Sequence, residues 1–468
     1  MRYLFTLLIC SYIAPVTNAQ EIVPIDGLAA FKDAGETWKL AGGVSADLAK
    51  PNVLYVREGQ KILVNRPDEK NKGQDLFTNR EFGDMDLELD FLMAKGSNSG
   101  IYLHGRYEIQ LEDSWTVRSP SSGKNGGIYE RWDEQRPAGQ KGYEGHPPRL
   151  NASRAPGLWQ HLKISFQAPR FDGTGKKIQP AKILQVTLNG VLIHEDVELS
   201  GPTRGGMGEE KTTGPLRFQG DHGAVAFRNI TITDYGSARP ESEDAKPYRV
   251  YPILVRGVDN PVFRSFMDLP GGTRVIHAVS ASSEENVHYT YDMDTGSIIQ
   301  VWRGDFLDAT PMWYSRGDGS SRPAGAVQTF GNPVTTISKL PSAKAPWKQD
   351  TTGTGFKPKG YVIDQHDNPA FRYALNGITV TDATDALPTG EGIRRHLTLS
   401  APAKDLYVRL AAGSSIELVE KGLYIVDDNA YYLRIEDAGG AEPVIRNTDG
   451  QTELILPIAM ELTYTLLF

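Results

Sequence analysis

Short segments in which apolar and polar residues alternate constrain this chain more than any other feature. The pattern is clear in Leu87–Phe91, Tyr107–Glu112, Leu184–Leu188 and Ala226–Ile232. Because successive side chains of a strand point to opposite faces of a sheet, this period of two predicts half-buried β-strands. Turn signals separate the segments, and Asn189-Gly190 is typical of a two-residue hairpin turn. The pattern therefore predicts an all-β protein built from sandwiches of antiparallel sheets.

A change in composition divides the chain into two parts. The length of 468 residues is enough for two or three domains. Residues 237–246 contain no apolar residue larger than alanine and are rich in charged residues and serine, which is typical of a linker. We therefore predict one domain over residues 20–236 and a second β-sandwich-type domain over residues 247–468.

The first nineteen residues have the features of a cleaved export signal. Arg2 precedes an apolar run from Leu4 to Val16, and small residues lead up to Ala19. The run is shorter than the roughly 20 residues that span a bilayer, so we predict cleavage after Ala19 rather than a membrane anchor. Cys10 is the single cysteine, and the mature chain would therefore have no disulfide and no thiol chemistry. A secreted or periplasmic location follows from this interpretation.

Charge and hydropathy argue against nucleic-acid binding and against a membrane-spanning segment. The formal net charge is −8, with acidic and basic residues well mixed and without a basic block. Nucleic-acid binding is therefore not expected. No second apolar run reaches the length of a membrane span, so we expect no membrane-spanning segment.

Alternation within Tyr107–Glu112 predicts a polar sheet face. The odd positions are apolar and should face the core, so Glu108, Gln110 and Glu112 should stand on the opposite, open face. A hairpin with the preceding strand would add Tyr102 and His104 to this face. An antiparallel sheet commonly has one solvated face, and that is the simplest interpretation of any single residue here. The combination of several ionisable groups on neighbouring strands favours a sugar-binding site.

Eight fragments, in this order, resemble the core pattern of the 3-keto-disaccharide hydrolase family over about residues 25–235. They are Asn98-Ser99-Gly100-Ile101, Tyr107-Glu108-Ile109-Gln110, Asp113, Gly127-Ile128-Tyr129, Trp159-Gln160, Leu188-Asn189-Gly190, Gln219-Gly220-Asp221-His222-Gly223 and Phe227-Arg228-Asn229-Ile230. The resemblance implies a concanavalin-like jelly roll exported from bacteria. It also implies substrates that are glycosides whose glucose ring carries a ketone at C3. Two segments, Glu130–Pro156 and Thr203–Thr213, are longer than the family pattern and are expected to reshape the pocket.

A ketone at C3 acidifies the proton on C2, so the glycosidic bond can break by elimination followed by hydration. Such a site needs a base, an electrophile for the ketone oxygen and an acid for the leaving group. The candidate proton carriers are Glu108, His222, His104 and Glu112. The candidate substrate-binding residues are Arg106, Gln110, Asp113, Tyr129, Gln219 and Tyr102. No cofactor is required, but a divalent metal is an alternative to Arg106 or Gln110 as the electrophile.

Three other functions remain open at this stage. A two-carboxylate glycosidase could use Glu108 and Glu112, but four residues along one strand place them roughly 13 Å apart, beyond the roughly 6.5–9.5 Å of inverting enzymes. Jelly rolls also serve as carbohydrate-binding modules without catalysis. The third alternative is an envelope scaffold. Residues 247–468 resemble no family that assigns them a role.

Overall fold

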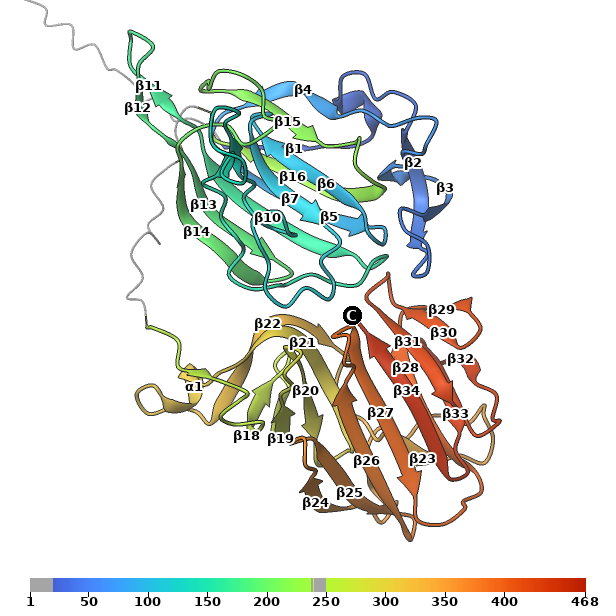
Figure 1. The fold of residues 1–468 in the computed structure, drawn as a ribbon. Helices are drawn as coiled ribbons and strands as arrows, with labels where there is room; N and C mark the ends of the chain where they lie inside the picture. Colours follow the sequence, from blue (N-terminus) through green and yellow to red (C-terminus); the bar gives the residue numbers. More distant parts are fainter. Residues whose placement is uncertain (1–19, 237–238, 240–249) are drawn as a thin grey trace, which may run out of the picture.

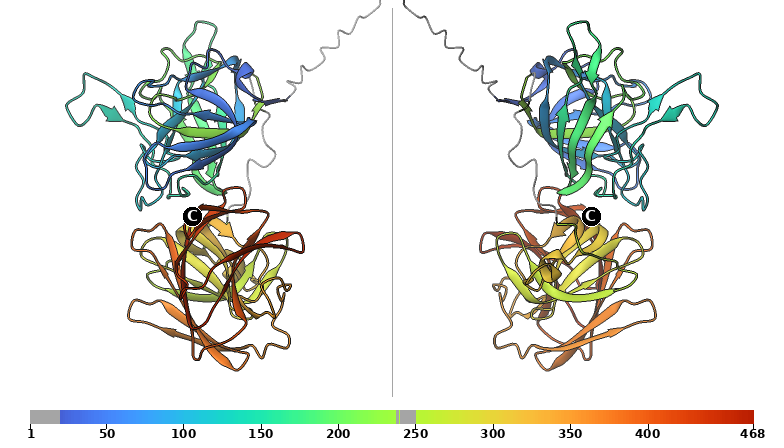
Figure 2. Two further views of the ribbon diagram at one scale, coloured as in Figure 1. Left: turned by 90° about the vertical axis from the view of Figure 1, so that its right-hand side faces the viewer. Right: turned by 90° about the vertical axis from the view of Figure 1, so that its left-hand side faces the viewer.

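The computed structural model describes residues 20–236, 239 and 250–468, which form two β domains (Figures 1 and 2). The predicted all-β class is confirmed, since the only helices of the described residues are η1 (Leu28–Ala30) and α1 (Thr310–Trp313). The predicted signal peptide lies outside the described residues. So does the predicted linker, apart from Arg239. No helix in the described ranges is long and apolar enough to cross a membrane.

The larger sheet of the N-terminal domain has eight antiparallel strands in the order β14-β13-β10-β5-β16-β3-β2, with β1 paired to β16. These strands are β1 (Glu21–Pro24), β2 (Trp38–Ala46), β3 (Leu54–Asn65), β5 (Met85–Met93), β10 (Gln160–Gln167), β13 (Ala181–Leu188), β14 (Val191–Leu199) and β16 (Val225–Asp234). Asn189 and Gly190 join β13 to β14, and both have positive φ angles, 50° and 80°. Such a turn matches the twist of the two strands, so the predicted hairpin is confirmed.

The smaller sheet has four strands in the order β4-β15-β6-β7. They are β4 (Leu76–Phe82), β6 (Asn98–Leu103), β7 (Tyr107–Glu112) and β15 (Gly214–Phe218). Ile109 and Leu111 are fully buried in a core that also includes Leu87, Leu89 and Phe91 of the larger sheet. The predicted inward parity of β7 is therefore confirmed. The segment Asn98–Gly100, which belongs to the first family fragment, is the first half of β6.

Four short strands form two small hairpins outside these sheets. They are β8 (Arg131–Trp132) with β9 (Gly142–Tyr143), and β11 (Arg170–Phe171) with β12 (Lys177–Gln179). The first hairpin belongs to the long segment Glu130–Pro156 that follows β7.

The C-terminal domain contains three sheets. Its six-stranded sheet runs β17-β21-β20-β19-β18-β22, and a further pairing of β21 with β22 closes five of these strands into a ring. The strands are β17 (Leu254–Val255), β18 (Val262–Asp268), β19 (Arg274–Ala281), β20 (Val287–Asp292), β21 (Ser297–Asp308) and β22 (Ser320–Thr329). Strands β20 and β21 pair as an antiparallel hairpin.

The other two sheets complete this domain, in the orders β23-β28-β33-β32 and β24-β25-β26-β27-β34-β31-β30-β29. The strands are β23 (Ile337–Lys339), β24 (Lys357–Ile363), β25 (Pro369–Leu375), β26 (Ile378–Ala386), β27 (Gly392–Leu399), β28 (Leu406–Gly413), β29 (Ile416–Glu420), β30 (Leu423–Val426), β31 (Tyr431–Asp437), β32 (Val444–Thr448), β33 (Gln451–Pro457) and β34 (Glu461–Leu467). Residues of all three sheets share one apolar core, to which Val301, Val408 and Leu433 belong.

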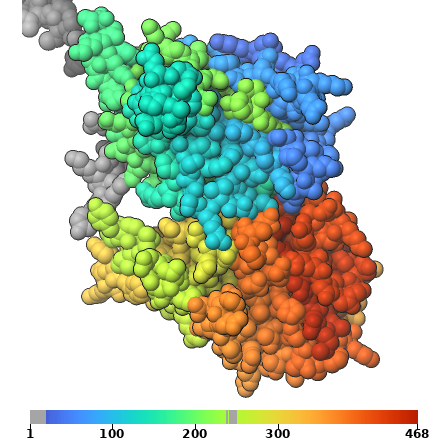
Figure 3. Space-filling view, viewed as in Figure 1, coloured from blue at the N-terminus to red at the C-terminus, as the bar shows by residue number. Residues whose placement is uncertain are grey.

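The two domains are in contact, as the space-filling view also shows (Figure 3). An apolar cluster crosses the boundary and includes Leu158 of the first domain and Leu423 and Tyr432 of the second. Arg154 reaches across to the second domain, where its guanidinium donates to Gln328 Oε1 (2.6 Å) and to the Val327 and Ala430 carbonyls (3.1 Å each). Burial lowers the pKa of Arg154 to about 10. Apolar packing and buried hydrogen bonds therefore join the domains.

Candidate active site

The β6–β7 hairpin sets the positions of the residues predicted to form the polar face. Gly100 pairs with Gln110, and Tyr102 pairs with Glu108. Because directly opposed residues of an antiparallel pair point to the same face, all four lie on the side opposite the core. The hairpin that the sequence argument assumed is therefore present.

The prediction that this face is open is wrong, because two distant segments cover it. Glu108 is 2% exposed and Gln110 is 4% exposed. Residues 126–129 run along the free edge of β7, where Tyr129 N donates to Glu108 O (3.0 Å). Farther along the same edge, Thr203 N donates to Arg106 O (3.0 Å), and Thr203 Oγ1 accepts the Glu108 amide (3.1 Å).

The two long segments noted in the sequence meet over the sheet. Arg204 N donates to Glu130 O (2.8 Å), and the Arg204 guanidinium lies 3.9 Å from the ring centre of Trp132. A Cβ atom at Gly205 would contact the Tyr102 hydroxyl, so this part of the cover lies directly on the face. The insertions therefore enclose the polar face instead of leaving it to solvent.

The side chain of Glu108 lies over Gly100, where a Cβ atom would overlap its carboxyl group. Its Oε2 atom is buried and has no hydrogen-bond partner among the described residues. Burial raises the pKa of Glu108 to about 8, against the lowering effects of the Tyr102 hydroxyl and the Arg217 guanidinium. The negative charges of Asp75 and Asp221 raise it further. A carboxyl with a pKa near 8 can exchange a proton at neutral pH.

Further polar atoms without partners are found on the neighbouring strands. Gln219 N donates to Gly100 O (2.8 Å), which places Gln219 beside Gly100 on the side away from Gln110. The side-chain oxygens of Gln110 and Gln219 are buried and unpartnered within the described part of the chain. Buried polar groups are nearly always hydrogen-bonded in native proteins. Three unpartnered acceptors around Gly100 therefore indicate a place where a ligand supplies donors.

Arg217 of β15 provides the positive charge of this site. It forms an ion pair with Asp75, donates to Gly205 O (2.7 Å) and lies 4.1 Å from the ring centre of Tyr102. Its Nε atom is buried without a partner in the described ranges. Arg217 was not among the predicted site residues. Asp75 precedes β4 and accepts the Gly220 amide (3.0 Å), and no sequence signal indicated it.

His222 lies at the exposed rim. Its side chain is 53% exposed, and its Nδ1 is hydrogen-bonded to Asp221. The negative charge of Asp221, the hydrogen-bond partner of His222, contributes to the raised pKa of Glu108. Tyr129, a predicted substrate-binding residue, is half-buried. Its backbone amide donates to the Glu108 carbonyl, so the two residues are neighbours.

His104 does not join Glu108, because it belongs to a turn. His104 and Gly105 both have positive φ angles, 53° and 66°, so the hairpin turns here and the strand alternation stops. The imidazole Nε2 is hydrogen-bonded to Gly83 O (3.0 Å), and the ring packs edge-on against Phe166 at 4.9 Å. Burial lowers the pKa of His104.

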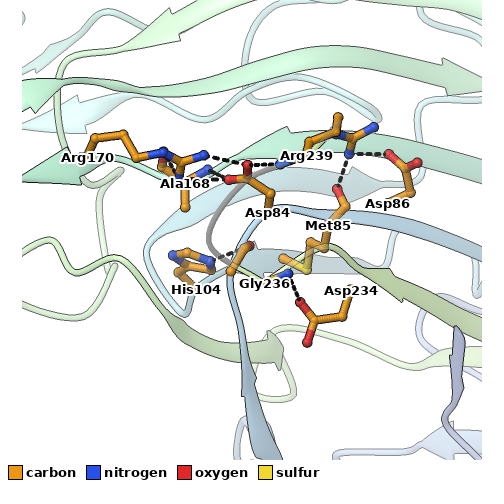
Figure 4. Close-up of polar contacts among 10 residues, drawn as sticks. Asp84, Met85, Asp86, His104, Ala168, Arg170, Asp234, Gly236 and Arg239 are labelled. Carbon is orange, nitrogen blue, oxygen red and sulfur yellow. Dashed lines mark hydrogen bonds and ion pairs between the residues drawn. The ribbon is translucent and has the colours of Figure 1, made fainter. Parts of the chain in front are cut away.

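Figure 4 shows His104 beside a structural network instead. The buried carboxylate of Asp84 accepts hydrogen bonds from Arg170 Nη1 (2.9 Å) and from the Ala168 amide (2.8 Å). It also accepts the Arg239 amide (3.0 Å), which holds the end of the domain. The Asp84 carboxylate of this network is thus held by three donors, whereas His104 Nδ1 and Arg239 Nε are buried without a partner among the described residues.

Three further predicted residues have structural partners. The Arg106 guanidinium donates to the Glu209 and His104 carbonyls (2.7 Å each). Glu112 accepts hydrogen bonds from Lys124 Nζ (2.7 Å) and Ser114 Oγ (3.0 Å). Asp113 accepts the amides of Gly96 (2.8 Å) and Trp115 (3.3 Å) and thereby shapes the turn after β7. The structure thus brings together Tyr102, Glu108, Gln110 and Gln219 near the rim residue His222, and separates His104, Arg106, Glu112 and Asp113 from them.

The tryptophans near the site have structural contacts as well. Trp115 Nε1 donates to Phe468 O (2.7 Å) across the domain boundary, and Trp132 packs under Arg204. Within the described residues, no group of three or more His, Cys, Asp or Glu side chains could hold a metal ion. The candidate site presents the Glu108 carboxyl, the Arg217 guanidinium and the side-chain amides of Gln110 and Gln219.

Comparison with known proteins identifies the class of the N-terminal domain. Residues 27–233 match the family model of the 3-keto-alpha-glucoside-1,2-lyase-like domain. The match confirms the resemblance found in the sequence and has nearly the same bounds. The N-terminal domain is thus a two-sheet β domain that is similar, over residues 27–233, to this carbohydrate-acting family.

Similar solved structures are distant. Two are proteins of Parabacteroides distasonis that are provisionally assigned as glycosyl hydrolases. One is 24% identical, with a TM-score of 0.30, and the alignment covers 48% of this chain and 94% of that chain. The other is 20% identical, with a TM-score of 0.29, and the alignment covers 45% of this chain and 98% of that chain. The binding domain of botulinum neurotoxin serotype D is 9% identical over 97% of this chain and 93% of that chain, with a TM-score of 0.23. No curated protein matches the chain.

Proposed function

We propose that the N-terminal domain cleaves glycosides that carry a ketone at C3 of the sugar, by elimination and then hydration. The observation that carries this proposal is the buried Glu108 carboxyl, whose pKa is raised to about 8. It lies over Gly100 among unpartnered side-chain oxygens. Elimination from a 3-keto sugar needs one base next to one electrophile, and Glu108 and Arg217 are such a pair.

In the first step, the Glu108 carboxylate removes the proton from C2 of the sugar. The electron pair of that C–H bond moves toward C3, and the ketone oxygen becomes an enolate. Arg217 stabilises this oxyanion through its unpartnered Nε–H group. We assign this role to Arg217 and not to Arg106, because the Arg106 guanidinium already donates to two backbone carbonyls.

In the second step, the enolate collapses, the C1–O bond breaks and a C1=C2 double bond forms. The departing oxygen takes a proton, and we assign its delivery to the His222–Asp221 pair at the exposed rim. Water then adds across the double bond, with its oxygen at C1 and a proton at C2, and the ketone is restored. The net reaction is hydrolysis, with Gln110 and Gln219 as acceptors for sugar hydroxyls.

A two-carboxylate mechanism is less well supported. Glu112, the only other glutamate of β7, has its carboxylate engaged by Lys124 and Ser114. It stands four residues from Glu108 on the same strand, roughly 13 Å away at about 3.3 Å per residue. Retaining and inverting glycosidases both need closer carboxyl groups.

The test is incubation of the intact protein with a 3-keto-glucoside and with its unoxidised parent, in D₂O. We expect cleavage of the oxidised compound alone, with deuterium incorporated at C2, because the base removes and returns a proton there. Glu108→Gln should abolish both cleavage and exchange, while the matched control Glu112→Gln should keep them. Cleavage of the parent glucoside, or cleavage without exchange at C2, would contradict elimination. Binding of the oxidised sugar without turnover would instead favour a carbohydrate-binding module.

A further inference from the structure

A cavity of about 480 Å³ opens in the C-terminal domain, far along the chain from the candidate active site. It lies between β18, β19, the turn after β20 and α1, which are neighbours in Figure 1. Ser265, Ala278 and Val279 are its buried lining residues. Its size is that of a small-ligand site, for which roughly 300–1,000 Å³ is typical.

The walls of this cavity present apolar groups that remain exposed. Ile276 is 52% exposed and Phe266 is 36% exposed, and Met293 and Met312 complete the wall. The Phe266 ring is fixed in place, since Arg274 lies 5.6 Å from its centre and a Cβ atom at Gly319 would crowd its edge. A fixed, exposed ring is a ready surface for the apolar face of a ligand.

The polar groups of the rim have free hydrogen-bonding capacity. His277 Nδ1 is hydrogen-bonded to both carboxylate oxygens of Asp294 (2.9 and 2.8 Å). This contact orients the imidazole and leaves Nε2 without a partner among the described residues. Arg264 lies 5.1 Å from the ring centre of Tyr361 and has no hydrogen bond or ion pair in the described part of the chain. The rim therefore offers guanidinium donors opposite imidazole and carboxylate acceptors.

We propose that this cavity binds one ring of a neutral glycan, with the sugar stacked on Phe266 and its hydroxyls bonded to Arg264, His277 and Asp294. A sugar ring has an apolar C–H face and an edge of hydroxyls that both donate and accept, which matches this arrangement. Arg264 and Asp294 have opposite charges, so the lining offers no excess charge to a uronate or an amino sugar. The choice of carbohydrate as ligand rests on the proposed function of the N-terminal domain.

Such a site would make the C-terminal domain a glycan anchor for the hydrolase. The domain boundary is packed and hydrogen-bonded, so a glycan held by the second domain would stay near the first. Cleavage of a small glucoside would not need the anchor, whereas capture of a polymer would.

The test is affinity electrophoresis of the intact Glu108→Gln protein in gels that contain laminarin, dextran or polygalacturonate. We expect retardation by a neutral glucan, with the apparent Kd raised at least tenfold by Phe266→Ala and by Asp294→Asn. Tyr251→Ala, which removes a more exposed aromatic outside the cavity, is the control and should bind as before. No retardation in any gel, retardation by polygalacturonate alone, or unchanged binding by both cavity variants would overturn the proposal.

A second measurement separates this proposal from the proposed function. Phe266→Ala in the otherwise native chain should hydrolyse a small 3-keto-glucoside at the native rate. If the native protein fails to hydrolyse that compound but is still retarded through Phe266, the catalytic proposal fails and the glycan site stands. If hydrolysis occurs and retardation does not, the glycan site fails alone.

Discussion

Replacing Glu108 with glutamine should stabilise the protein at alkaline pH while it abolishes catalysis. The pKa of this carboxyl is raised from 4.5 to about 8 because the side chain is buried. Between these values the folded protein keeps a proton that the unfolded chain has lost, so stability falls as the pH rises. Below about pH 4.5 both states are protonated, and the cost of ionising the group in the fold is absent.

The magnitude follows from about 1.4 kcal/mol for each tenfold change in an equilibrium constant. Raising the pH from 5 to 8.5 should cost the native protein on the order of 3–4 kcal/mol through Glu108 alone. Glutamine cannot ionise, so Glu108→Gln avoids this loss. The advantage of the variant in free energy of unfolding should therefore grow with pH by about that amount.

Urea unfolding of both proteins at pH 5 and at pH 8.5 measures this difference. Glu112→Gln is the control on the same strand, since the Glu112 carboxylate pairs with Lys124 and is not enclosed with Glu108. Its free energy of unfolding relative to the native protein should show no such growth with pH. If Glu108→Gln also shows none, the carboxyl is solvated at both pH values, and the enclosed site is refuted.

Three other outcomes follow from the same geometry. The kcat/KM for a 3-keto-glucoside should rise about tenfold per pH unit up to a plateau near pH 8, because the base is the ionised form of Glu108, and a pH–rate profile measures this. Gly100→Ala should displace the Glu108 carboxyl and lower kcat/KM at least about 100-fold while circular dichroism stays native, as steady-state kinetics would show. Arg154→Ala should destabilise the contact between the domains by about 2–4 kcal/mol, because it removes buried hydrogen bonds across the boundary. In differential scanning calorimetry, a single unfolding transition should then split into two, and an unchanged thermogram would contradict the coupling of the domains.

Alternation in the sequence correctly predicted which side chains of a strand share a face, because the strand backbone itself determines this. A strand has a fixed side-chain period, so the burial of Ile109 and the shared face of Glu108 and Gln110 could be deduced from residue order alone. The Asn189-Gly190 hairpin was predictable for a similar reason, because both residues tolerate positive φ angles.

The exposure of that face could not be deduced, since it depends on segments far away in the sequence. Residues 126–129 and 203–206 cover Glu108, and nothing within β7 encodes their position. His104 is separated from Glu108 by a local cause, a turn with two positive φ angles. Histidine is not among the residues that dominate turns, so the sequence did not indicate this turn. Asp75 was missed because it acts through Arg217 across the sheet.

One segment after β7 connects the candidate site to the second domain. Its residues 126–129 pair with β7 and cover Glu108, while Trp115 before them and Arg154 after them donate to carbonyl groups of the second domain. Asn125 links these parts, since its amide nitrogen donates to Ser153 Oγ (3.0 Å) and to Gln160 Oε1 (3.1 Å). Burial of the Glu108 carboxyl raises its pKa, so whatever holds this segment in place also sets the proton affinity of the base. Through this segment, the second domain is therefore linked to the enclosure that raises the pKa of Glu108.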